Sequence, residues 1–109
     1  MGLIENLEAM LAQGQDSAVL RFGLGNAYLA KGGPAAAAEH LRAAVAQDPE
    51  YSAAWKALGT ALAQMDQGEA AADAYRRGID AADKRGDVQG AKEMRVFLRR
   101  LQRFGGQPE

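Results

Sequence analysis

Cysteine is absent from this chain, and histidine and β-branched residues are scarce. Without cysteine the protein can form neither a disulfide framework nor a thiolate metal site, and we expect a reducing compartment and therefore a cytoplasmic location. The amino-terminal residues lack a basic segment followed by an unbroken apolar one, so they do not resemble a signal peptide. No apolar run approaches the length of a membrane-spanning helix, and we expect no membrane association.

An excess of charge of one sign is also missing, since the formal net charge at pH 7 is −1. A balance so close to neutral gives no general attraction to nucleic acid or to anionic membranes. Alanine is abundant instead, and the Ala-rich runs 35–46 and 70–82 favour helix over strand. A chain of 109 residues, 48% of them hydrophobic, is long enough for one domain with a modest continuous core.

Catalysis and metal binding have few candidate side chains. His40 is the only histidine, and no serine or carboxylate is placed in sequence to form a relay with it, so we expect it at a surface or half-buried helix position. One histidine with scattered carboxylates does not supply a metal-ligand set. Gly23 and Gly25 lie in an expected helix with no preceding strand and no third glycine, which excludes a dinucleotide-binding loop. We expect no enzyme activity and no cofactor.

Two consecutive blocks, 18–51 and 52–85, are approximate copies of each other at a spacing of 34 residues. The identities are Leu24/Leu58, Gly25/Gly59, Ala27/Ala61, Ala36/Ala70, Ala37/Ala71, Ala38/Ala72 and Arg42/Arg76. A period of this length indicates a stacked helical unit that cannot bury its own apolar face and needs neighbours to do so.

Large, small and aromatic residues recur at fixed places in both copies. The second copy has Trp55, Leu58, Gly59, Leu62, Ala71, Tyr75 and Gly78, with Asp83 where proline is usual. The first has Leu24, Gly25, Tyr28, Gly32, Ala37, Leu41, Ala44 and Pro49, with Arg21 where an aromatic is usual. This pattern resembles the tetratricopeptide repeat over residues 18–85. The resemblance implies an all-α fold, in which antiparallel helix pairs form a right-handed superhelical stack.

The glycines of the pattern have a physical explanation. Glycine costs roughly 0.5–1 kcal/mol relative to alanine inside a helix, so Gly25 and Gly59 need a compensating contact. Close approach of the following antiparallel helix would provide it, with Ala37 or Ala71 as the matching small surface. The sequence therefore predicts a tight helix crossing at each glycine.

Six helices are expected, at about 3–13, 17–31, 35–47, 51–65, 69–82 and 87–103. Helix 3–13 matches the second half of a repeat, because Leu7 and Leu11 lie 34 residues before Leu41 and Val45. It is expected to be an amino-terminal cap, and helix 87–103 a carboxy-terminal cap. We expect a single domain over residues 1–104, with 18–51 and 52–85 as its two repeats and 105–109 as a flexible tail.

The last helix departs from the 34-residue spacing, which would bury Lys92 and Glu93 at the tightest contact. A contraction of two residues instead aligns Gly90-Ala91 with the Leu-Gly pair and Met94 with the large apolar position. Phe97, Leu98 and Leu101 then share the buried stripe with Met94. The outer face would consist of Lys92, Arg95, Arg99, Arg100 and Arg103.

A concave groove is the best candidate for a binding site, because in the family that this chain resembles the first helix of each repeat lines such a surface. The residues that helical periodicity turns away from the packing stripes are Val19, Phe22, Asn26, Leu29, Ala53, Lys56, Thr60, Ala63 and Gln64. They combine an apolar floor with a few polar anchors, as binding clefts do. The groove predicts a non-catalytic adaptor that holds a peptide or a partner helix.

One branch of the family clamps the carboxylate end of chaperone tails with basic and asparagine side chains. Here only Asn26 falls at a matching place, whereas Phe22 stands at the first clamp lysine and Ala57 at the second asparagine. We therefore do not predict chaperone-tail binding.

Two alternative functions remain open. The groove or an exposed end could mediate homodimerisation, if an apolar surface is left uncovered. The basic face of the last helix could bind an acidic partner or RNA, although a solvated face that keeps the cap in solution explains the same residues. Aromatic side chains do not alternate with the arginines there, so nucleic acid is the less favoured ligand.

Overall fold

The computed structural model describes residues 2–105. Each of the six expected helical segments is a helix in it. The elements are α1 (Leu3–Ala12), α2 (Ala18–Lys31), α3 (Pro34–Gln47), α4 (Ser52–Gln64), α5 (Gly68–Arg85), α6 (Val88–Arg100) and a closing π-helical turn η1 (Leu101–Gly105). Of the predicted tail, Gly105 belongs to η1 and residues 106–109 lie outside the described residues.

Side chains and glycines at the helix ends explain where the elements begin and stop. Ser17 caps α2, because its hydroxyl oxygen accepts the Leu20 N–H at 3.1 Å. Gly32 ends that helix in the left-handed region at φ 86°. α5 continues to Arg85, three residues beyond its expected end, and stops at Gly86 with φ 76°. The extra turn is held by buried alanines and moves the start of the next helix.

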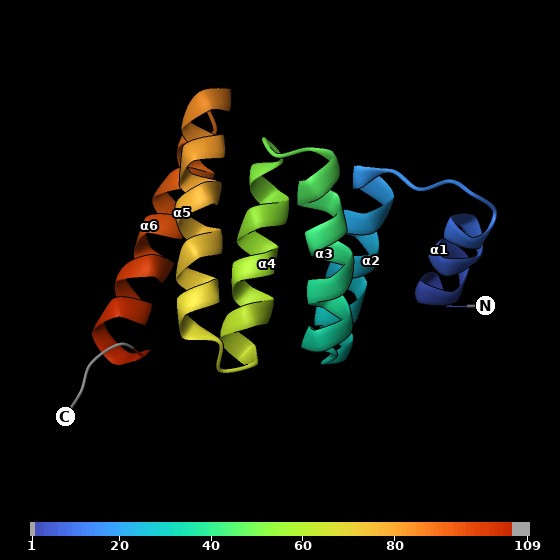
Figure 1. The fold of residues 1–109 in the computed structure, drawn as a ribbon, viewed down its shortest axis with the longest axis horizontal. Helices are drawn as coiled ribbons and strands as arrows, with labels where there is room; N and C mark the ends of the chain where they lie inside the picture. Colours follow the sequence, from blue (N-terminus) through green and yellow to red (C-terminus); the bar gives the residue numbers. More distant parts are fainter. Residues whose placement is uncertain (1, 106–109) are drawn as a thin grey trace.

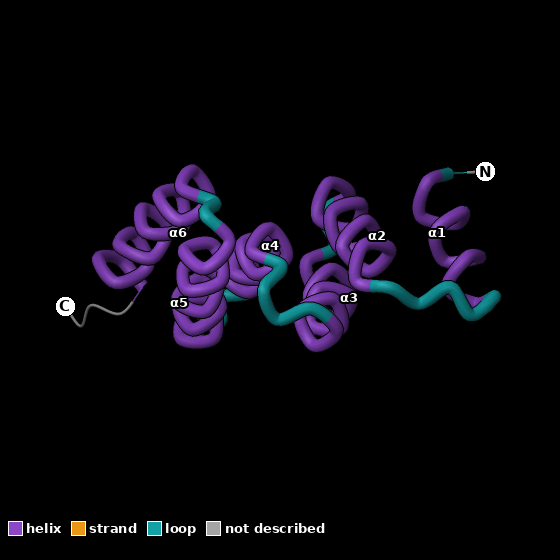
Figure 2. Tube along the Cα trace, turned by 90° about the horizontal axis from the view of Figure 1, so that it is seen from above, coloured by secondary structure: helices purple, strands orange, loops and turns teal. Residues whose placement is uncertain are grey.

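The helices form antiparallel pairs that stack side by side. α2 packs against α3 and α4 against α5, while α1 and α6 lie at opposite ends of the row (Figure 1). Seen from above, α2, α4 and α6 lie along one side of the stack and α3 and α5 along the other (Figure 2). This confirms the predicted all-α helical-repeat fold.

The tight crossings occur at the glycines where they were predicted. A Cβ added to Gly59 would lie 2.5 Å from Cε1 of Tyr75, and a Cβ on Gly25 would overlap the Leu41 side chain. The expected partners Ala37 and Ala71 are fully buried, but they are not the nearest groups. Large side chains of the second helix, rather than small ones, therefore occupy the space that each glycine leaves.

The carboxy-terminal helix has a buried stripe as predicted, but in a different register. Met94 is fully buried, and the three other residues expected on the stripe pack half-buried around it. α6 begins 36 residues after α4, so the spacing lengthens by two residues rather than shortening by two. A Cβ on Gly90 would meet the Asp87 carboxylate and not another helix. Gly90 therefore does not hold the Leu-Gly position.

Candidate functional site

The nine predicted groove residues come from α2 and α4, on the side of the stack that also includes α6 (Figure 2). We call this side the α2/α4/α6 face. Val19, Asn26, Ala53 and Gln64 are exposed on it, whereas Phe22, Leu29, Lys56, Thr60 and Ala63 are half-buried. The structure thus brings all nine to one face, although only some of them are open to a ligand.

Two of the predicted polar anchors already have partners inside the chain. Lys56 forms an ion pair with Glu93 of α6. Hydrogen bonds from the Gln89 amide and from Lys56 lower the pKa of Glu93 below its ordinary value. The Thr60 hydroxyl lies 3.0 Å from the Tyr75 hydroxyl and donates to the Lys56 carbonyl oxygen at 3.1 Å. A ligand would have to compete with these contacts to use either side chain.

An apolar hollow opens between α4, α5 and α6 on this face. Its volume is about 330 Å³, and its lining consists of Thr60, Ala63, Gln64, Tyr75 and Phe97. The Tyr75 and Phe97 rings pack at 5.6 Å between centroids with an interplanar angle of 50°. Burial raises the pKa of Tyr75, which keeps its hydroxyl protonated at neutral pH. We call this the aromatic hollow.

The last helix forms a wall of the aromatic hollow. Phe97 of α6 faces Thr60 and Ala63 of α4 across it. Sequence analysis assigned Tyr75 and Phe97 to the packing stripe and missed their second role as hollow-lining residues. Their helical positions alone could not distinguish the two roles.

The first repeat contributes a different kind of surface. The Phe22 ring packs on Tyr51 at 4.9 Å between centroids with a tilt of 43°. Tyr51 comes directly before α4, so this contact joins the two repeats. Beside it, Val19 remains 71% exposed. The predicted apolar contact residues therefore divide into a packed aromatic pair and an open aliphatic position.

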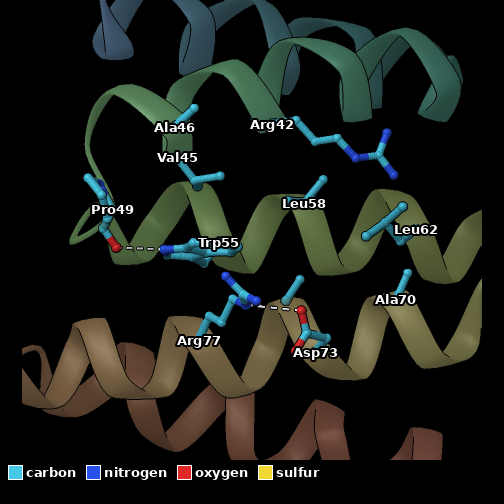
Figure 3. Close-up of a pocket in the computed structure, with 11 residues that line it drawn as sticks. Arg42, Val45, Ala46, Pro49, Trp55, Leu58, Leu62, Ala70, Asp73 and Arg77 are labelled. Carbon is cyan, nitrogen blue, oxygen red and sulfur yellow. Dashed lines mark hydrogen bonds and ion pairs between the residues drawn. The ribbon is translucent and has the colours of Figure 1, made fainter.

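A second groove, missed in the sequence, lies on the opposite side between α3 and α5, with α4 at its floor (Figure 3). Its volume is about 420 Å³. The Trp55 indole N–H donates to the Pro49 carbonyl oxygen at 2.7 Å, and Arg77 lies over the Trp55 ring at 5.7 Å. Arg77 also pairs with Asp73 at 3.0 Å. We call this the α3/α5 groove; the aromatic position of the repeat was its only trace in the sequence.

The basic outer face of the last helix is placed as predicted. Lys92, Arg95, Arg99, Arg100 and Arg103 are all exposed. Arg95 pairs with Asp83 of α5 at 3.0 Å, which neutralises part of the face. The remaining cations extend from the middle of α6 into η1.

At the amino-terminal end, Arg21 occupies the repeat position that Trp55 holds in the second copy. Its guanidinium makes two bonds to the Asp16 carboxylate, at 2.8 and 2.9 Å, and lies 3.2 Å from Nδ1 of His40. Hydrogen bonds from Arg21 and Gln47 lower the pKa of Asp16 to about 2. His40 is half-buried, as expected, and its ring takes part in this structural network.

Metal and membrane sites were also considered. Within residues 2–105, no three His, Cys, Asp or Glu side chains come together at a geometry that could hold a metal ion. None of the helices in that range combines the length and the apolarity that crossing a bilayer requires.

Known proteins similar to this chain share its repeat. A family model described as tetratricopeptide repeat matches residues 22–91. The chain is 52% identical over 101 residues to the TPR repeat-containing protein PA0015 of Pseudomonas aeruginosa, covering 93% of this chain and 96% of that protein. It is 34% identical over 76 residues to the heat-shock protein cognate co-chaperone sgt12 of Aspergillus fumigatus, covering 70% of this chain and 22% of that protein. Its structure is similar to the solution structure of a Bordetella parapertussis protein, with a TM-score of 0.80, 50% identity, and coverage of 94% of this chain and 90% of that one.

Proposed function

The chain belongs to the tetratricopeptide-repeat family, and on that premise we propose that it is a non-catalytic adaptor that binds a peptide or a helix of another protein on its α2/α4/α6 face. The observation that carries this proposal is the aromatic hollow. Its walls come from three helices, and its lining is mainly apolar with hydroxyl and amide groups at the edge. Such a site suits one apolar side chain of a bound segment.

The chemistry of the face favours an internal apolar segment over a terminal carboxylate. A carboxylate needs a free cation, but Lys56 is paired with Glu93. Phe22 and Ala57 offer no charge at the places where a carboxylate clamp would need polar side chains. The co-chaperone name of the Aspergillus relative therefore does not extend to carboxylate capture here. Exposed Asn26 and Gln64 can instead pair with the backbone of the segment.

The bound segment is expected to be short. Two repeats and a capping helix offer few positions, so affinity for a lone peptide is modest. A partner that already presents its segment as a helix would lose less conformational entropy on binding.

A peptide-display selection on the immobilised domain tests the proposal. Selected peptides are synthesised with a fluorophore, and their binding is measured by anisotropy. Ala63→Arg places a long side chain in the aromatic hollow and is expected to weaken binding at least tenfold. Ala70→Arg is the matched control, because it puts the same residue on the wall of the α3/α5 groove.

The two variants separate the possible sites. Loss of binding with Ala63→Arg alone supports the α2/α4/α6 face. Loss with Ala70→Arg alone would move the site to the α3/α5 groove. Binding that neither substitution changes would contradict the adaptor function proposed for this face.

A further inference from the structure

α1 carries apolar side chains on a face that no other described helix covers. It has the 34-residue register of α3, so that Leu3 and Met10 correspond to Ala37 and Ala44. Those alanines are completely buried, because α3 packs between α2 and α4. Leu3 is 63% exposed and Met10 is 39% exposed, and α1 contacts only α2. α1 is therefore a second helix without the first helix of its pair.

The opposite situation exists at the other end of the stack. α4 packs between α3 and α5, but α6 packs against α5, the edge of α4 and the short turn η1. Within residues 2–105 it has no following helix. A hollow of about 550 Å³ opens beside α6, lined by Val96, Arg99, Arg100, Gln102 and Arg103. α6 is therefore a first helix without its second.

The two ends also carry opposite charge. α1 contains Glu5 and Glu8 and no lysine or arginine. α6 and η1 contain five cations and one acid, Glu93, which is already paired with Lys56. Arg99 and Arg100 form no ion pair within the described part of the chain. Opposite charges on the two incomplete ends favour contact between them.

We propose that α6 of one copy receives α1 of a second copy, so that two half repeats form one helix pair between molecules. Leu3 and Met10 of the incoming helix would lie along the outer face of α6, with its carboxylates near Arg99 and Arg100. Because these apolar side chains are larger than the alanines of α3, the helices stay farther apart than α2 and α3. The contact is between different surfaces, so it repeats and forms open chains rather than closing as a two-fold dimer.

The size of the contact sets the conditions of the test. A ten-residue helix buries a small area, so association is weak and needs high protein concentration. Its charged component weakens as salt increases. Sedimentation equilibrium on the wild-type chain is therefore measured over a range of concentrations at about 20 mM and about 500 mM NaCl. The average mass is expected to rise with concentration at low salt, beyond that of two chains, and to fall at high salt.

Apolar and charge variants locate the contact. Leu3→Ser/Met10→Ser changes only exposed side chains and is expected to weaken association at least tenfold. Val19→Ser is the matched control, since Val19 is a similarly exposed apolar residue away from both ends. Glu5→Lys and Arg99→Glu/Arg100→Glu should each reduce self-association, and mixing the two proteins should restore it, because each end then meets opposite charge.

Three results would overturn the proposal. One is a mass that stays at a single chain throughout the low-salt series. Another is association that stops at two copies. The third is association that Leu3→Ser/Met10→Ser leaves unchanged while circular dichroism shows both variants folded. None of these results bears on the peptide site, which lies on a different face.

Discussion

Tyr75 lies directly over Gly59, with its Cε1 atom 2.5 Å from the point where a Cβ on that glycine would be. The ring belongs to α5 and the glycine to α4, so this contact sets the spacing of the second helix pair. Tyr75 is only 4% exposed and cannot move aside into solvent. The same ring also forms one wall of the aromatic hollow. Repeat packing and the candidate binding site therefore depend on one side chain.

Gly59→Leu is expected to destabilise the protein by about 1–3 kcal/mol, because overpacking a filled core forces shifts of side chains and backbone. Chemical denaturation followed by circular dichroism measures the loss. Gly68→Ala is the control, since an added Cβ there has no atom within 4 Å and the backbone is not left-handed. Equal stability of Gly59→Leu and wild type would mean that the helices are not closely packed at this crossing.

Tyr75→Phe tests the polar edge of the aromatic hollow. The substitution keeps the ring but removes the 3.0 Å hydrogen bond with the Thr60 hydroxyl. The free energy of unfolding should fall by about 0.5–1.5 kcal/mol. Thr60 retains its 3.1 Å bond to the Lys56 carbonyl oxygen, which limits the loss. Comparison with Thr60→Val and with the double variant isolates the coupling, and additive effects would show that the two hydroxyls do not interact.

Acid should destabilise the amino-terminal network. The pKa of Asp16 falls from its ordinary 3.8 to about 2, chiefly through the hydrogen bond from Arg21. A lowered carboxyl pKa stabilises the folded state above the ordinary value, and that contribution disappears as the pH falls toward the folded pKa. The melting temperature of Asp16→Asn should therefore lie below wild type at neutral pH and converge with it between pH 4 and pH 2.

Glu39→Gln is the control for that series. Glu39 is exposed on α3 and makes no hydrogen bond within residues 2–105, so its removal changes net charge alone. If Glu39→Gln and Asp16→Asn gave the same pH profile, the effect would come from overall charge and not from the network.

Asp66 is the one described residue other than glycine with a positive φ, at 59°. Gly32, 34 residues earlier, has φ 86° at the corresponding turn of the first repeat. A side chain in the left-handed region costs roughly 1–2 kcal/mol, and less for aspartate than for most residues. Asp66→Gly should therefore raise the melting temperature slightly, whereas Asp66→Val should lower it. A rise with valine would contradict this explanation of the turn.

Much of the fold followed from local rules in the sequence. The repeated Leu-Gly pairs indicated the crossings, and Ser17, Gly32 and Gly86 indicated the helix ends. The register of α6 did not follow. Gly90-Ala91 imitates a Leu-Gly pair, but α5 continues for an extra turn on buried Ala81 and Ala82 and displaces the next helix. How far a helix continues depends on what covers it, and a pattern of single residues does not contain that information.

The candidate site was predicted less completely than the fold. Helical periodicity placed all nine residues on the correct face, because direction depends only on spacing along a helix. It could not show that Lys56 would meet Glu93, which lies 37 residues away on another helix. Nor could it show that Tyr75 and Phe97 leave a hollow between them. Contacts between elements depend on register and tilt, which the sequence specifies only through the whole packed stack.

Trp55 is the only tryptophan in the chain, and it lies in the α3/α5 groove beneath Arg77. Its fluorescence therefore reports on that groove and is insensitive to a ligand on the opposite face. A titration in which emission stays constant would say nothing about the aromatic hollow. A change in emission would indicate either a ligand beside Trp55 or a rearrangement of the repeats. An extrinsic fluorophore on the α2/α4/α6 face, for example at an engineered Gln64→Cys, would give that face its own optical reporter.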